Sequence, residues 1–130
     1  MRIAVLVIGV LAVSSSARGQ RLAVYESEAN SQEYHGIYQE PLRAWLADRG
    51  LGFEVIGDSV AAGAEQLARY DLVLAASVYV VPEACAQGLA QYLNGGGRVI
   101  WLDSPARCRD AGFRAALGLG PATAYAPLTE

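Results

Sequence analysis

The stretch RVIWLDSPARC, residues 98–108, places chemically competent side chains at the end of an apolar run. Asp103 and Ser104 follow the run directly, and Cys108 comes soon after Pro105. In α/β proteins the end of a strand commonly presents a nucleophile or a ligand contact. Asp103 also suits a structural role, because its carboxylate can cap a following helical turn. The stretch is therefore interpreted either as a functional turn or as a turn that only keeps the architecture of such a site.

A second group of such side chains lies in the segment YESEANSQEYHGIY, residues 25–38. Carboxylates together with the single histidine, His35, can hold a divalent cation or act as acid and base. Their spacing follows no metal-ligand motif, so we predict no metal and no cofactor. The alternatives that remain are a solvated polar loop and a sugar-binding loop, in which a ring stacks on C–H faces and carboxylates accept hydrogen bonds from hydroxyls.

Tyr79, in the segment SVYVVPE, is interpreted either as a lid over the same crevice or as a contact to a partner. No pair of carboxylates is singled out as the acid and nucleophile of a glycosidase. The candidate ligand-binding residues are Glu26, Glu28, Tyr34, His35, Tyr79, Asp103 and Ser104.

The two cysteines, Cys85 and Cys108, are expected at the carboxyl ends of neighbouring strands. In an exported chain we predict a disulfide between them, which would constrain the unfolded state by about 3 kcal/mol. Two unpaired thiols, with Cys85 as a small core residue, are the alternative. A third interpretation makes Cys108 a reactive nucleophile near His35.

The amino-terminal region has the pattern of a secretory signal peptide. Two residues, Met1 and Arg2, precede an apolar run over 3–13, and small residues follow at Ala17 and Gly19. The run is too short to cross a bilayer, which needs about 20 helical residues. We predict a signal peptide over 1–19, with cleavage after Ala17 and a buried first strand as alternatives. The protein is then secreted or periplasmic, with no membrane span after cleavage.

Size and charge limit the remaining function classes. Residues 20–119 suffice for one small domain, and 120–130 have the composition of a tail or linker. The net charge of the chain is −3, which disfavours nucleic acid as a partner.

Apolar patterns of two kinds alternate along the domain. Strand-like runs occupy 21–27, 53–58, 70–77 and 98–103, and the latter two are apolar on both faces. Helical spacing occurs over 38–49, 61–69, 83–94 and 111–117, with Gly50 and the NGGG segment as helix ends. Right-handed crossovers then predict a flavodoxin-like three-layer α/β/α sandwich with a parallel sheet of order 2-1-3-4. A full domain of this type usually adds a fifth strand and a closing helix; either the tail supplies a minimal edge in their place, or the chain is the front part of a longer protein.

The segment YDLVLAASVYVVPEACAQGLAQYLNGGGRVIWLDSPA, residues 70–106, resembles the class I glutamine amidotransferase-like superfamily. It is most similar to the noncatalytic, trimerisation-type middle domain of bacterial β-galactosidases and related secreted proteins. Catalytic members have a cysteine between glycines in the turn after the strand that matches 98–103. This chain has Asp103, Ser104, Pro105 and Ala106 there, and it has no histidine after His35.

Amidotransferase chemistry is therefore not expected, since Pro105 also removes a backbone donor that an oxyanion would need. The resemblance implies a noncatalytic interaction or ligand-binding module linked to carbohydrate processing. Its expected partners are carbohydrate or a glycoside-hydrolase domain, or further copies of the chain in a homo-oligomer. Two alternatives stay open: a small secreted hydrolase using residues 26–35 with Asp103 and Ser104, and the amino-terminal fragment of a longer glycoside hydrolase.

Overall fold

The computed structural model describes residues 19–30, 38–76, 78, 80–102 and 110–119. Its sheet consists of β1 (Leu22–Tyr25), β2 (Phe53–Ile56), β3 (Leu72–Ala76) and β4 (Val99–Leu102). All pairings are parallel and the order is β2-β1-β3-β4. This confirms the predicted α/β fold and strand order, and it fits a flavodoxin-like arrangement. The predicted signal peptide and the tail over 120–130 lie outside the described residues, except for Gly19.

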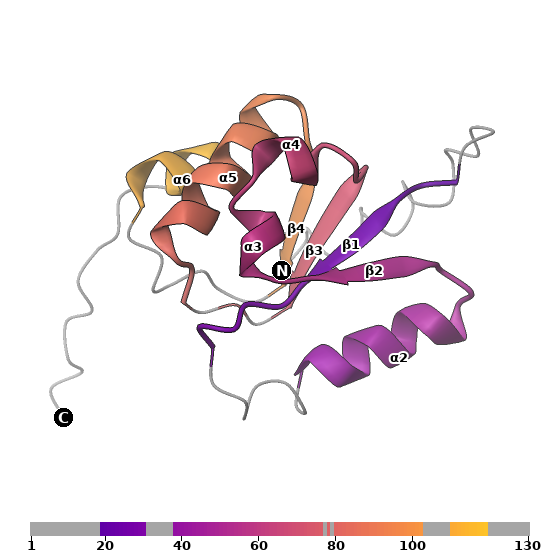
Figure 1. The fold of residues 1–130 in the computed structure, drawn as a ribbon. Helices are drawn as coiled ribbons and strands as arrows, with labels where there is room; N and C mark the ends of the chain where they lie inside the picture. Colours follow the sequence, from indigo (N-terminus) through magenta and orange to yellow (C-terminus); the bar gives the residue numbers. More distant parts are fainter. Residues whose placement is uncertain (1–18, 31–37, 77, 79, 103–109, 120–130) are drawn as a thin grey trace, which may run out of the picture.

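Helices cover both faces of the sheet, but unequally (Figure 1). One face carries α2 (Glu40–Asp48). The other carries α3 (Asp58–Ala61), α4 (Ala64–Leu67), α5 (Glu83–Asn94) and α6 (Ala111–Ala116). None of the helices among these residues is long and apolar enough to cross a membrane.

The alternation of side chains along β1 divides the core in two. Leu22 and Val24 pack with Leu46 of α2, whereas Ala23 and Tyr25 pack with α3, α4, α5 and α6. All four residues of β1 are buried, because β1 has a neighbouring strand on each side and helices on both faces. The near-continuous apolar run predicted for β3 is buried in the same way, whereas the same prediction was wrong for β4, which is only partly buried because it is an edge strand.

One helix departs from the sequence prediction. The helix predicted over 61–69 is present only as α4, which begins at Ala64, and a separate helix, α3, begins at Asp58, at the end of the predicted strand-like run 53–58, and ends at Ala61. Between them Gly63 has extended dihedral angles (φ −110°, ψ 107°), which a continuous helix does not permit. Glycine lowers helix propensity at this point, so two short helices replace one.

The helix ends predicted at glycine are confirmed. At the end of α5, Gly96 has a φ of 94°, its N–H donates to the carbonyl of Leu93, and the N–H of Gly97 donates to that of Tyr92. This is the Schellman pattern, in which a left-handed residue satisfies the last carbonyls of a helix. The helices α2 and α6 end in the same way, with Gly50 and Gly118 in the left-handed region.

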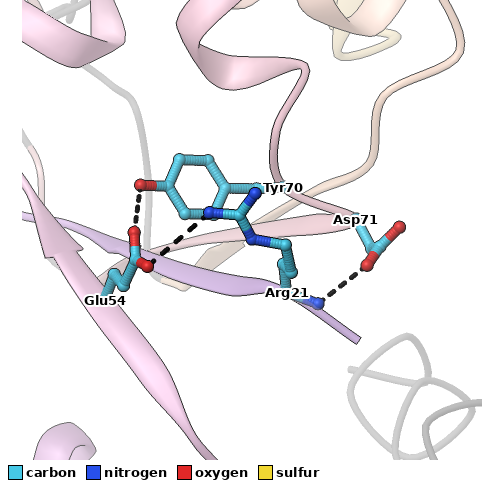
Figure 2. Close-up of polar contacts among 4 residues, drawn as sticks. All are labelled: Arg21, Glu54, Tyr70 and Asp71. Atoms are coloured by element: carbon cyan, nitrogen blue, oxygen red, sulfur yellow. Dashed lines mark hydrogen bonds and ion pairs between the residues drawn. The ribbon is translucent and has the colours of Figure 1, made fainter. Parts of the chain in front are cut away.

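Polar contacts tie the amino ends of the strands together (Figure 2). Arg21, just before β1, donates its backbone N–H to the Asp71 carboxylate at 2.7 Å. Its guanidinium lies 3.7 Å from Glu54 of β2, which also accepts a hydrogen bond from the Tyr70 hydroxyl at 2.5 Å. These exposed side chains align three strands at the edge opposite to the one where ligands bind in this fold class. We therefore assign them a structural role.

A tight contact between α5 and the end of α3 yields a testable expectation. A Cβ atom at Gly88 would lie 2.7 Å from the Ala62 carbonyl oxygen and closer still to that of Ala61. An alanine in a helix interior ordinarily stabilises by about 0.5–1 kcal/mol. Gly88→Ala should instead destabilise by about 1–3 kcal/mol, because both obstructing atoms belong to the backbone.

Denaturant unfolding measures this difference. Gly52→Ala is the matched control, since a Cβ atom at Gly52 meets nothing within 4 Å. A Gly88→Ala protein as stable as the Gly52→Ala protein would show that α3 and α5 do not approach this closely.

Candidate functional site

The candidate site is the carboxyl edge of the sheet around β1. The chain leaves β1 toward β2 on one side, while β3 and β4 lie on the other, so the strand order reverses between β1 and β3. In open α/β sheets this reversal leaves a crevice where ligands bind. The described part of this edge consists of residues 26–30, the start of α3, residue 78 and residues 80–82.

Two of the predicted site residues, Glu26 and Glu28, belong to this edge. The others, Tyr34, His35, Tyr79, Asp103 and Ser104, lie outside the described residues, and so does Cys108. The structure places Glu26 and Glu28 in different surroundings: Glu26 contacts α2, whereas Glu28 contacts the start of α3. The proposal that all seven form one surface therefore stays a prediction.

Glu26 lies beside Arg43 of α2, and neither Arg43 nor Gln39 at the start of the same helix was selected by the sequence analysis. The Oε1 atom of Glu26 is 3.0 Å from Nε of Arg43, although the two atoms are not aligned for a hydrogen bond. Gln39, at the N-cap of α2, is fully buried, and neither atom of its amide has a hydrogen-bond partner. A buried amide without a partner is unusual in a folded protein.

The sequence positions these three side chains through two periodicities. Leu22, Val24 and Glu26 alternate along β1 and its extension, so Glu26 follows the apolar residues that face α2. Gln39 and Arg43 are four residues apart on the helix and therefore neighbours, and Leu46 completes the same face. Polar residues at inward positions of a helix are the signal that would have identified Gln39 and Arg43.

Glu28 has a clear structural function. Its Oε2 atom accepts a hydrogen bond from the backbone N–H of Asp58 at 3.0 Å, the first residue of α3. The N-cap residue Gly57 provides no side chain for this purpose, and a Cβ atom there would collide with the Glu28 carboxylate. Glu28 thus supplies from a distant segment the cap that the helix itself lacks.

Asp58 is the centre of a second polar cluster, on the face of the sheet opposite to α2. The Tyr25 hydroxyl donates to Asp58 Oδ1 at 2.7 Å, and Sγ of Cys85 donates to the Asp58 carbonyl oxygen at 3.3 Å. Burial alone would raise the pKa of Asp58, but hydrogen bonds from Ser27 and Tyr25 outweigh it and lower that pKa. Burial and the bond to Asp58 raise the pKa of Tyr25, which stays protonated.

Cys85 is a free, buried thiol whose Sγ points to Asp58. The predicted disulfide with Cys108 is therefore not formed at Cys85 in this structure, and the alternative of a small core residue describes its surroundings. Burial raises the pKa of the thiol, and the Asp58 carboxylate adds to this effect. Such a cysteine is a poor nucleophile, because the reactive species is the thiolate.

Asn30 joins the loop after β1 to the loop after β3, across the reversal of strand order. Its Nδ2 donates to the carbonyl of Val80 and its Oδ1 accepts from the N–H of Val80, both at 3.0 Å. The side-chain amide of Asn30 thus exchanges two hydrogen bonds with the backbone of one residue, as paired residues of neighbouring strands do. Ser27 supports this turn by accepting the N–H groups of Ala29 and Asn30.

Metal binding receives no support from the described residues, among which no three histidine, cysteine, aspartate or glutamate side chains form a group suited to a metal ion. What the edge offers instead is hydrogen-bonding chemistry from carboxylates, amides and a guanidinium.

The environment of Cys85 predicts low reactivity. In a Cys108→Ser variant, the remaining thiol should react with Ellman's reagent at pH 8 at least about 100-fold more slowly in the native protein than in guanidinium, because it is 1% exposed and protonated. Equal rates would contradict this burial.

A count of reactive thiols in the wild-type chain, denatured without reductant, tests the predicted disulfide. Two reactive thiols would exclude the disulfide, and no reactive thiol would establish it.

Comparison with known proteins adds no relative. No family model, curated protein or solved structure matches this chain. The resemblance to the amidotransferase-like superfamily therefore rests on the pattern of residues 70–106, and the fold rests on the structure described above.

Proposed function

We propose that this chain is an exported, noncatalytic domain of the amidotransferase-like type that binds a polar ligand in the service of carbohydrate processing. The ligand site is the carboxyl edge around β1. A glycoside-hydrolase domain or a further copy of the chain is the macromolecular partner that the resemblance implies.

The observation that carries this proposal is the gathering of hydrogen-bonding side chains where the strand order reverses. Glu26, Gln39 and Arg43 bring a carboxylate, an amide and a guanidinium to the α2 side of this edge, whereas the amide of Asn30 is already paired with the Val80 backbone. These are the groups that recognise hydroxyl-rich molecules, since together they offer donors and acceptors at fixed positions. The acidic net charge of the chain favours such ligands over nucleic acid.

Several features disfavour catalysis at the described part of the edge. Cys85 is buried with a raised pKa, so it is not an activated nucleophile. Glu28 accepts a backbone N–H, and Asp58 accepts the hydroxyl of Tyr25. A glycosidase needs one carboxyl group with a raised pKa and a second that is free to attack or to activate water. The pKa of Asp58 is lowered instead.

Titration of the full-length exported chain with neutral oligosaccharides tests the proposal. We expect saturable binding, with amide NMR shifts that map to residues 26–30, 39–43 and 80–83, and no hydrolysis of the sugar. Glu26→Gln should weaken binding about tenfold, as expected for loss of a charge-assisted hydrogen bond of about 1.5 kcal/mol.

Glu65→Gln is the matched control, because Glu65 is exposed on α4 and distant from the edge. Shifts confined to other parts of the chain, or no binding to any sugar, would refute the proposal. Turnover of a chromogenic glycoside that disappears in His35→Ala or Asp103→Ala would establish the hydrolase alternative in its place.

A further inference from the structure

Most of the buried side-chain polar atoms without a hydrogen-bond partner in the described part of the chain belong to three residues. Five buried side-chain nitrogen or oxygen atoms there lack a hydrogen-bond partner. One is Nε1 of Trp101, and the other four belong to Glu26, Gln39 and Arg43. Glu26 Oε1 and Arg43 Nε form an ion pair at 3.0 Å, whereas both amide atoms of Gln39 have no partner. Buried polar groups in native proteins are nearly always satisfied, so the Gln39 amide and the unaligned ion pair require an explanation.

The four atoms form a balanced set of donors and acceptors. Oε1 of Gln39 and Oε1 of Glu26 accept hydrogen bonds, whereas Nε2 of Gln39 and Nε of Arg43 donate them. The charges of Glu26 and Arg43 cancel at 3.0 Å. A complementary ligand must therefore both donate and accept at neighbouring positions while carrying no net charge. Two adjacent hydroxyl groups meet both requirements, because each hydroxyl donates one hydrogen bond and accepts others.

We propose that Glu26, Gln39 and Arg43 form a binding site for a pair of neighbouring hydroxyl groups of a neutral sugar. The inference rests on the proposed function and specifies its ligand class and its contacts. Gln39 is the fully buried residue of the site, and its amide provides an acceptor atom, Oε1, and a donor atom, Nε2. Glu26 and Arg43 supply the second acceptor and donor from β1 and α2.

The exposure of the three side chains indicates how the ligand enters. Gln39 is 0% exposed, while the side chains of Glu26 and Arg43 are 10% and 38% exposed. The site is thus closed in this structure and opens to solvent beside Arg43. The Arg43 and Glu26 atoms form an ion pair at 3.0 Å without an aligned hydrogen bond, so a small rotation of the guanidinium that keeps the two charges together breaks no aligned bond between them. Arg43 is therefore the side chain that moves when the ligand binds.

Gln39→Leu tests the site, since leucine has a similar volume and no polar atoms. The full chain is titrated with galactose and with glucose, and with galacturonate and galactosamine as charged relatives. We expect the neutral sugars to bind most tightly and Gln39→Leu to lose at least tenfold in affinity. The unfolding midpoint of the unliganded variant should rise by about 5 °C, because an unsatisfied buried amide has been removed.

Gln91→Leu, at an exposed glutamine of α5, is the matched control and should leave affinity and midpoint unchanged. Arg43→Lys keeps the charge but lacks the Nε donor, and it should also lose at least tenfold in affinity while the fold persists. If Gln39→Leu fails to fold, the sugar affinity of Arg43→Lys tests the site on its own.

The outcomes separate this inference from the proposed function. Unchanged sugar affinity in Gln39→Leu and Arg43→Lys would overturn the site and leave the proposed function standing. A lowered midpoint in unliganded Gln39→Leu would show that ordered water satisfies the amide, and this too would overturn the inference. If galacturonate binds tenfold more tightly than the neutral sugars, the ligand is an anion, and this outcome overturns the inference of a neutral ligand. Failure of the wild-type chain to bind any sugar would refute both proposals.

Discussion

The pairing of β1 with both β2 and β3 is the constraint on which the rest of the structure depends. A strand with a neighbour on each side and helices on both faces has no exposed surface, so its side chains must be apolar or have a hydrogen-bond partner. All four residues of β1 are buried, and the hydroxyl of Tyr25 donates to Asp58. The same pairing brings the carboxyl end of β1 to the reversal of strand order. Side-chain alternation continues beyond the strand and sends Glu26 toward α2, while Ser27 joins Tyr25 and Asp58 on the other face.

The sheet thereby separates two polar clusters with different physical character. On the face opposite to α2, the groups of Tyr25, Asp58 and Cys85 satisfy one another, and burial keeps the phenol and the thiol protonated. A fully satisfied buried network fixes geometry. On the α2 face, the Glu26–Arg43 ion pair has no aligned hydrogen bond, and the buried amide of Gln39, one turn before Arg43, has no hydrogen-bond partner. This difference between a satisfied and an unsatisfied cluster is the reason for proposing the second as a binding surface.

The sequence specifies the fold more fully than the site. Continuous apolar runs identify buried strands such as β3, and glycines such as Gly96 mark helix ends, because few other residues adopt a φ of 94°. The break at Gly63 escaped prediction because one glycine in a helical pattern is often tolerated. Gln39 and Arg43 escaped it because chemical motifs are sought in loops after strands, whereas these residues gain meaning only from the helix face they share with Leu46. Of the predicted site residues, Glu26 and Glu28 could be placed, and Glu28 proved to be a helix cap.

The anchoring of α2 determines how readily that cluster can open. Leu46, near its carboxyl end, is the buried residue of this helix, whereas α5 buries Cys85, Ala86, Gly88, Leu89, Ala90 and Tyr92. The Schellman turn at Gly50 fixes the same carboxyl end. α2 is thus attached through Leu46 and the partly buried Leu42, fewer buried apolar residues than α5 contributes, and elements with little buried apolar surface open at the lowest free energy. An unsatisfied amide costs about 1–3 kcal/mol, a large share of the stability of a small domain. In the proposed site, this amide at the start of the weakly anchored helix α2 would lower the free energy needed to admit a ligand, because opening the site also returns the amide to a hydrogen-bonding environment.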